Sequence, residues 1–201
     1  MLQLIIMTNL PITRNEAIQL LKSMDQQIPD MNHYLETEAI MEALAERFGE
    51  DTAYWGLIGL LHDVDWALTR DDRKEHCIKV VEILKSKGFD DKFIQIVQSH
   101  AYRYHAIPAL SGKQRTEKIE HALVAAETLT GIIYAYALIR GRKISGMDAT
   151  GLKKRFKENK FAEKCDRELV REIEKTGMTL DEFFGLSINA FKKIKEEIGL
   201  E

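Results

Sequence analysis

Residues 54–63 read YWGLIGLLHD, and this stretch decides the fold. A helix over about 51–62 would be apolar nearly all round, which is typical of a central helix enclosed by other helices. The helix would end in the pair His62-Asp63. Burying an imidazole and a carboxylate without partners costs free energy, so both side chains need partners there. A bound divalent cation would supply them, and so would an ordinary hydrogen-bonded pair.

Helical periodicity extends along the rest of the chain. The three prolines, at positions 11, 29 and 108, stand where the apolar periodicity breaks, which favours long helices joined by short connections. Thr13 with Glu16, and Thr179 with Glu182, have the spacing of capping boxes at helix starts. We therefore predict an all-α fold. The expected helices cover about 13–24, 32–48, 51–62, 90–101, 116–139, 166–176 and 180–198, with another that ends at Gly88 and a loop over 102–115.

Composition limits the partners. The 201 residues carry a net charge of -3, which gives no sign of the basic surface that nucleic-acid binding requires, so we expect no nucleic-acid polymer as a partner. The apolar residues 1–7 lack a basic leader and are too short to cross a membrane. We expect an N-terminal arm over 1–12 and no membrane partner. Whether the chain forms a homo-oligomer is left open. Cys77 and Cys165 offer no disulfide framework and no Cys-based zinc spacing, which indicates a reducing cytoplasm.

Four of the six histidines extend apolar faces at helix ends. Positions three, four, seven or eleven apart share a helix face. By this test His33 shares a face with Ile40 and Leu44, His62 with Trp55 and Ile58, His76 with Val80 and Ile83, and His100 with Phe93 and Ile96. A polar pocket walled by four helices would produce this pattern, whereas any one of these histidines taken alone could be a hydrogen-bonded core residue.

Three further residues carry weaker signals. His105 lies in the expected loop, where it either closes over the pocket or is solvated. His121 is assigned a structural or surface role. Glu127 lies in AAETLTG, residues 125–131, where small and apolar neighbours make a solvated acid unusual and Gly131 lets a backbone or ligand approach. Glu127 is therefore a candidate ligand, the alternative being a glutamate that reaches solvent from the helix edge.

The order of these residues resembles the HD-domain superfamily of metal-dependent phosphohydrolases over about residues 30–140. A histidine on an early helix is followed by His-Asp at the end of the next helix and by a late carboxylate in AAETLTG. The finer motifs resemble those of small bacterial HD-domain hydrolases. They are LHD at 61–63, EH at 75–76, EILK at 82–85, KG at 87–88, SH at 99–100, FA at 161–162 and DRE at 166–168.

The resemblance implies an architecture and a ligand set. It implies a single HD-type helical bundle over 13–145, with additional C-terminal helices over 146–201 packed on it. One metal would be held by His33, His62, Asp63 and Glu127, the last standing where the family usually has an aspartate. A weaker second metal, or the substrate, would meet His76, His100 and His105. Ala101 stands where the family usually has a second histidine, so we expect one tight metal site.

This donor set and the resemblance together predict an activity. Two imidazoles and two carboxylates suit Mn, Fe, Co, Ni or Zn as the divalent cofactor. The expected reaction is hydrolysis of a small phosphate ester, with nucleotides among the candidates, by a metal-activated water. Asp63 and Asp65 are the candidate catalytic acids, and Asp65 would orient the attacking water or else cap the following turn.

Positive charge must offset the charge that develops on the phosphate. The candidate side chains are Arg70, Arg73, Lys74 and Arg103. Two other function classes remain open. One is a non-catalytic nucleotide-binding or signalling module, and the other is a di-iron oxygenase on the same scaffold, with His76 and His100 as iron ligands.

Overall fold

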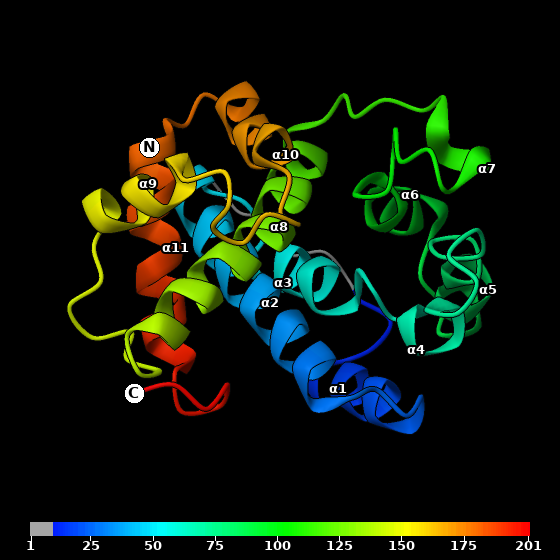
Figure 1. Ribbon diagram of the computed structural model, residues 1–201. Helices are drawn as coiled ribbons and strands as arrows, with labels where there is room; N and C mark the ends of the chain where they lie inside the picture. Colours follow the sequence, from blue (N-terminus) through cyan, green and yellow to red (C-terminus); the bar gives the residue numbers. More distant parts are fainter. Residues whose placement is uncertain (1–9) are drawn as a thin grey trace, which may run out of the picture.

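The computed structural model describes residues 10–201, and its regular elements are helices (Figure 1). No strand is formed within these residues, so the predicted all-α class is confirmed. In chain order the helices are α1 (Arg14–Ser23), α2 (Ile28–Phe48), α3 (Thr52–Leu61), α4 (Trp66–Thr69), α5 (Val80–Ser86), α6 (Asp91–Ser99), α7 (Pro108–Ser111), α8 (Lys118–Ile139), α9 (Ala149–Lys157), α10 (Arg167–Arg171), the 3-10 helix η1 (Glu172–Thr176) and α11 (Leu180–Ile194).

Local sequence signals account for several helix starts. Both predicted capping boxes are present, at the first residues of α1 and of α11. In each box the threonine hydroxyl accepts the N–H of the glutamate three residues later, and the glutamate carboxylate accepts the threonine N–H. These bonds satisfy N–H groups that have no partner inside the helix.

Two prolines start helices instead of separating them. α2 begins at Ile28, earlier than the predicted position 32, because Pro29 lies in its first turn, where a missing N–H costs no helical hydrogen bond. Pro108 begins α7 in the same way. The prediction of an uninterrupted loop over 102–115 was therefore wrong at residues 108–111.

α3 is the central helix that its apolar sequence predicts. Residues 55–61 of α3 are all buried, and the helix contacts α1, α2, α6 and α8. Gly59 lets the backbone of α2 approach directly, since a Cβ atom there would lie 2.9 Å from the Thr37 carbonyl oxygen and 3.0 Å from Glu38 Cα. This contact fixes the distance between the middle of α2 and the end of α3.

The long helix α8 crosses α2 and closes the other side of the core (Figure 1). By length and composition α8 is the one helix of residues 10–201 that could span a membrane. Most of it is buried against α2, α6, α9, α10 and η1, as in the core helix of a soluble protein. Its buried residues include Ile119, Leu123, Leu129, Ile132 and Ile133.

The C-terminal helices share the same core. α11 packs along α2, and α9 packs on α8 and α11. One apolar cluster includes residues from Ala17 to Leu200.

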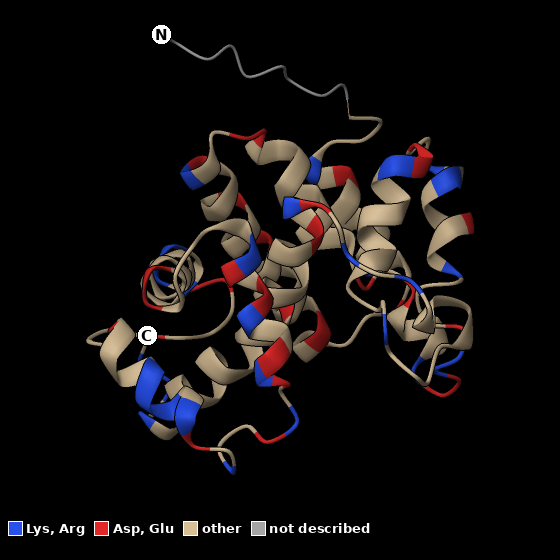
Figure 2. Ribbon diagram, turned by 90° about the horizontal axis from the view of Figure 1, so that it is seen from above, with Lys and Arg blue, Asp and Glu red and all other residues tan. Residues whose placement is uncertain are grey.

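The domain boundary near residue 145 stays a prediction, and residues 1–9 of the expected arm lie outside the described residues. Figure 2 shows acidic and basic residues interspersed along the helices in that view.

Candidate metal centre

The structure brings four histidines together from separate segments. His33 lies in α2, His62 directly follows α3, His76 precedes α5 and His100 follows α6. The Nε2 atoms of His33 and His62 are 3.1 Å apart, and those of His76 and His100 are 3.4 Å apart. The His62 and His100 rings connect the two pairs, with their centroids 5.1 Å apart. The four helix-end histidines therefore form one cluster.

Hydrogen bonds on the outer side of the cluster fix the orientation of every ring. Each ring donates a hydrogen bond from its Nδ1 atom. The accepting atoms are Thr130 Oγ1 for His33 (3.0 Å), the Gly59 carbonyl oxygen for His62 (2.8 Å), Asp65 Oδ1 for His76 (3.0 Å) and the Val97 carbonyl oxygen for His100 (2.7 Å). Thr130 donates its hydroxyl hydrogen to the Glu127 carbonyl (2.6 Å), so its oxygen accepts from His33. With Nδ1–H committed in this way, each Nε2 is the atom free to meet a cation.

Asp63 lies between the two histidine pairs. Its Oδ2 atom is 3.6 Å from Nε2 of His62, and its Oδ1 atom is 3.1 Å from Nε2 of His100 and 3.4 Å from Nε2 of His76. Oδ1 is buried and has no hydrogen bond of good geometry. A buried carboxylate oxygen without such a bond needs another partner. Converging imidazole nitrogens around it fit a divalent transition-metal ion.

The donor atoms form two compact groups, each with its ligand atoms within 4.8 Å of one another. One group is His33, His62 and Asp63, and the other is His76, Cys77 and His100. Both groups draw on residues that are far apart in the sequence.

The charges of the cluster differ between its two sides. Burial lowers the pKa of His62 to about 3 and also lowers the pKa of His33, so these imidazoles are neutral at pH 7. Burial also lowers the pKa of His76, but the Asp63 carboxylate and the hydrogen bond to Asp65 outweigh it and raise that pKa to about 10. A cation at the second group would therefore displace a proton from His76.

The pKa of Asp63 itself is well below its ordinary value. Burial raises it, but the surrounding imidazoles of His62, His76 and His100 outweigh burial. The pKa of His100 is raised well above its ordinary value, against the effect of burial, by Cys77 and by Asp63. Asp63 is therefore a carboxylate at neutral pH, in the state that binds a cation.

Asp65 lies behind His76 and not in the cavity wall. It is fully buried, and its Oδ1 and Oδ2 atoms accept hydrogen bonds from His76 Nδ1 (3.0 Å) and the Val80 backbone N–H (3.2 Å). Both oxygens accept a hydrogen bond within the fold, and the side chain is not among those that line the cavity. The geometry favours a positioning role for Asp65 instead of the catalytic role that we expected.

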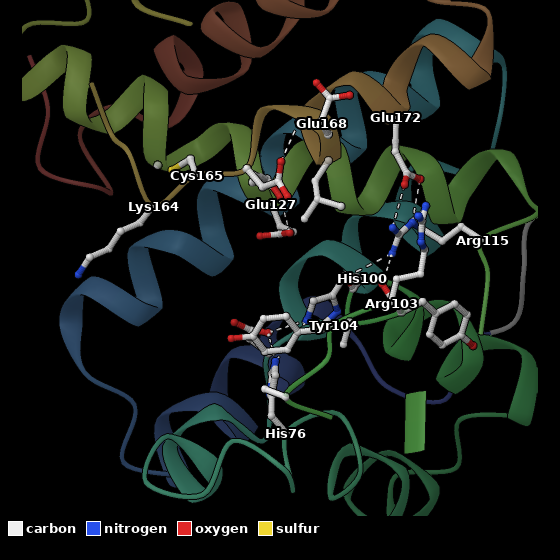
Figure 3. Close-up of a pocket in the computed structure, with 18 of the residues that line it drawn as sticks. His76, His100, Arg103, Tyr104, Arg115, Glu127, Lys164, Cys165, Glu168 and Glu172 are labelled. Atoms are coloured by element: carbon white, nitrogen blue, oxygen red, sulfur yellow. Dashed lines mark hydrogen bonds and ion pairs between the residues drawn. The ribbon is translucent and has the colours of Figure 1, made fainter. Parts of the chain in front are cut away.

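Glu127 faces the same cavity from α8 (Figure 3). Its Oε1 atom accepts a hydrogen bond from Thr128 (2.6 Å), and it belongs to neither compact donor group. Burial raises the pKa of Glu127 to about 7, with the positive charge of His100 opposing that effect. Its place as the fourth ligand of the first metal stays a prediction.

A cavity of about 1050 Å³ opens beside the cluster (Figure 3). Arg73, Arg103 and His105 line it, whereas Arg70 and Lys74 do not. Lys74 is exposed at the surface. Two of the four expected phosphate-binding cations are therefore placed at the cavity. The facing wall adds Lys164, Arg171 and Lys175 from the α10 and η1 region, which the sequence patterns did not single out.

Sequence reasoning also missed Arg115, which lines the cavity but is committed to the fold. Its Nε and Nη2 atoms both donate to the Glu172 carboxylate at 2.8 Å, and its Nη1 atom donates to the Ser99 carbonyl at 2.8 Å. His121 Nδ1 donates to the same carboxylate at 2.7 Å. These bonds give His121 a structural role. An arginine in a loop segment carries no periodic signal from which this network could be predicted.

Cys77 is the other residue that sequence reasoning missed. Its Sγ atom lies 3.5 Å from Nε2 of His76 and 3.5 Å from Nε2 of His100. The available signal was its place directly after an inward-facing histidine, but a single cysteine has no spacing pattern to identify it as a ligand.

Comparison with known proteins agrees with this geometry. The sequence model of the HD domain family matches residues 31–128, a range that begins before His33 and ends after Glu127. Comparisons with curated proteins and with solved structures give no match. The HD-domain superfamily consists mostly of metal-dependent hydrolases. Residues 31–128 thus match the HD domain family, and this match supports the resemblance of that part of the chain to the HD-domain superfamily.

Proposed function

We propose that this protein is a metal-dependent phosphohydrolase that acts on a small phosphate ester, with nucleotides as the first candidates. The observation that carries the proposal is the convergence of three Nε2 atoms, those of His62, His76 and His100, on Asp63, whose Oδ1 atom is buried without a good hydrogen bond. Residues His33, His62 and Asp63 would hold the first cation, with Glu127 as the proposed fourth ligand. Mn, Fe, Co, Ni and Zn all suit these donors.

A bound divalent cation lowers the pKa of a coordinated water and offsets negative charge on a phosphoryl oxygen. The residues of the chain prepare for that chemistry. The bonds from Nδ1 keep the rings oriented before any cation arrives, so little reorganisation is needed. Asp63 contributes negative charge at the centre of the cluster, because the imidazoles around it keep its pKa low.

The cavity favours a small phosphorylated substrate. At about 1050 Å³ it is at the upper end of the usual range for small-molecule sites. Arg73 and Arg103 lie in its wall, where a guanidinium can bind a phosphate through two hydrogen bonds. Tyr104, half-exposed in the same wall, offers a ring for an apolar or aromatic part of the substrate. We place this activity in the cytoplasm, because both cysteines are free thiols.

The test combines metal content with turnover. The purified protein is stripped with a chelator, reloaded with Mn, Fe, Co, Ni or Zn, assayed for bound metal by elemental analysis, and screened for phosphate release from nucleotides and simple phosphate esters. We expect His62→Ala and Asp63→Ala to lose both bound metal and phosphate release. Asp71→Ala is the matched control, since Asp71 is an exposed carboxylate outside the cavity wall, and it should retain both.

Several outcomes would contradict the proposal. Full activity in the His62 or Asp63 variant would remove the metal mechanism. Phosphate ligands that bind without turnover in any metal form would favour a non-catalytic module, and oxygen consumption by a form with two irons would favour an oxygenase. For Glu127→Asp, unchanged metal content and rate would exclude Glu127 as a ligand.

A further inference from the structure

Cys77 has unusual surroundings for a buried cysteine. Its side chain is fully buried, and a free cysteine in such a place normally packs as a small apolar group. Here its Sγ atom instead lies 3.5 Å from Nε2 of His76 and 3.5 Å from Nε2 of His100. Sulfur is a weak hydrogen-bond donor and a weak acceptor, so Cys77 is a poor hydrogen-bond partner for either nitrogen. Two ring nitrogens and a sulfur atom therefore face one another at short distances, with only weak hydrogen bonds to the sulfur.

The triangle of these three atoms has the dimensions of a metal site. In a tetrahedral zinc site, with Zn–N of about 2.0–2.1 Å and Zn–S of about 2.3 Å, two nitrogens lie roughly 3.3 Å apart and a nitrogen and a sulfur roughly 3.6 Å apart. The corresponding distances here are 3.4 Å between the nitrogens and 3.5 Å from each nitrogen to sulfur. Asp63 Oδ1, at 3.4 and 3.1 Å from the same nitrogens, lies beside the triangle.

The chain holds all three donors in place. Asp65 and the Val97 carbonyl fix the His76 and His100 rings through Nδ1. Cys77 has a backbone φ of 60°, a conformation that residues other than glycine rarely adopt, and its carbonyl accepts a hydrogen bond of 2.6 Å from Gln98. This anchor from α6 keeps the cysteine side chain directed at the two imidazoles.

We infer that Cys77 is a metal ligand, and that its thiolate forms with His76 and His100 a second metal position beside His33, His62 and Asp63. Sulfur makes this position suit a thiophilic ion such as Zn²⁺ or Co²⁺ and disfavours Mg²⁺ and Mn²⁺. Binding there releases the thiol proton and any Nε2 proton of His76 and His100 to solvent. Asp63 lies between the two positions. The inference rests on the proposed metal centre, but it does not depend on phosphate release.

The experiment is a Co²⁺ titration of the chelator-stripped, reduced protein, followed by absorbance. A thiolate ligand gives a sulfur-to-cobalt charge-transfer band in the near ultraviolet, which nitrogen and oxygen ligands do not give. We expect the band in the wild type and its loss in Cys77→Ser, with the affinity for the second ion reduced about tenfold or more. Cys165→Ser is the matched control, because Cys165 is the other cysteine of the chain and belongs to neither donor group. It should keep the band.

A second measurement uses the wild type alone and so does not depend on the folding of a variant. Bound Co²⁺ should slow the alkylation of Cys77 by iodoacetamide, as measured by peptide mass spectrometry, with the rate at Cys165 as the internal reference. Cobalt that binds without the sulfur band, a band that persists in Cys77→Ser, or alkylation of Cys77 that is unchanged by cobalt would each overturn this inference and leave the first metal position intact. No cobalt binding at all would overturn both the inference and the proposed metal centre.

Discussion

The hydrogen bonds on the outer side of the four imidazoles determine how these residues act. A 180° flip of any of these rings would break its hydrogen bond from Nδ1. Nε2 is therefore the atom that binds a cation or a proton. For His62 and His100 the acceptor is a backbone carbonyl three residues earlier. For His76 the acceptor is the side chain of Asp65, which mutation can change.

Asp65→Asn tests this positioning role. The asparagine has one acceptor where Asp65 uses two oxygens, so either the His76 ring or the Val80 N–H loses its partner. We expect metal affinity to fall about 10- to 100-fold, as for other residues that orient metal ligands. Metal-binding titration with a competing chelator measures this change. Asp71→Asn, an exposed neighbour, is the control, and equal affinities in the two variants would refute the role.

At the residue scale, the sequence could predict the histidines but not all of their neighbours. His33, His62, His76 and His100 were selected because helix periodicity is strong enough to say which side faces inward. Cys77 was not selected, because its position depends on a left-handed backbone conformation and on a hydrogen bond from α6. Neither feature produces a recognisable pattern in the sequence. Which of the expected basic side chains line the cavity likewise depends on loop conformation, which the sequence pattern does not predict.

At the element scale, the contact between α2 and α3 sets the geometry of the first metal position. Gly59→Ala would place a methyl group 2.9 Å from the Thr37 carbonyl and 3.0 Å from Glu38 Cα, so the two helices must separate. We expect a loss of about 1–3 kcal/mol of unfolding free energy and weaker metal binding, since His33 moves away from His62. Urea unfolding and metal titration measure the two effects.

Gly185→Ala in α11 is the matched control for this change. A Cβ atom at Gly185 would meet nothing within 4 Å. Replacing a helical glycine with alanine where the added methyl group meets no clash should raise the free energy of unfolding by roughly 0.5–1 kcal/mol. Metal affinity should be unchanged. If Gly59→Ala behaved like Gly185→Ala, the close backbone contact would have no energetic importance.

The buried network of Glu172, Arg115 and His121 connects η1 to α8 and to the segment that follows α6. Burial raises the pKa of Glu172, but hydrogen bonds from Arg115 and His121 outweigh it and lower that pKa to about 2. The resulting stability is present above pH 4.5, the ordinary pKa, and is lost as the pH falls through about 2.

Glu172→Gln should therefore destabilise the protein by about 3–5 kcal/mol at pH 7, because Arg115 is left buried without its counter-charge. The difference from the wild type should shrink as the pH falls below 4.5, because Glu172 then takes up a proton in the unfolded wild type, whereas in the folded state it stays charged down to about pH 2. Denaturant unfolding at pH 7 and pH 3 checks both statements. Glu174→Gln, at an exposed ion pair with Arg171, should change stability by less than about 1 kcal/mol.

The elements themselves were largely predictable. Long amphipathic or apolar periodicity located α1, α2, α3, α6, α8 and α11, and the capping boxes located two of their starts. The short helices α4 and α7 were not predicted, because four residues are too few to show a period. Pro29 was interpreted as a break although it begins a helix, since proline is compatible with both.

At the scale of the whole molecule, a metal centre would connect segments that the apolar core connects only indirectly. His33 belongs to α2, His62 follows α3, and His76 and His100 flank the pair α5 and α6. Ions that bind the folded chain alone stabilise it by mass action, by about 2.7 kcal/mol at a hundredfold excess over Kd.

We therefore expect chelation to lower the melting temperature by about 5–10 °C for a chain of this size. Thermal melting followed by circular dichroism, with and without chelator, measures the shift. In Asp63→Ala the two curves should coincide. A wild type whose melting temperature is unaffected by chelator would show that no cation contributes to its stability.

The glycine at position 59 has one more consequence, which concerns protein engineering. Since main-chain atoms meet there without a side chain between them, the spacing of the helices on either side does not vary with the rotamers of nearby residues. Exchanging one coordinating side chain for another should then alter ion preference while the scaffold keeps its shape. That property makes this small helical chain a suitable host for redesigned selectivity.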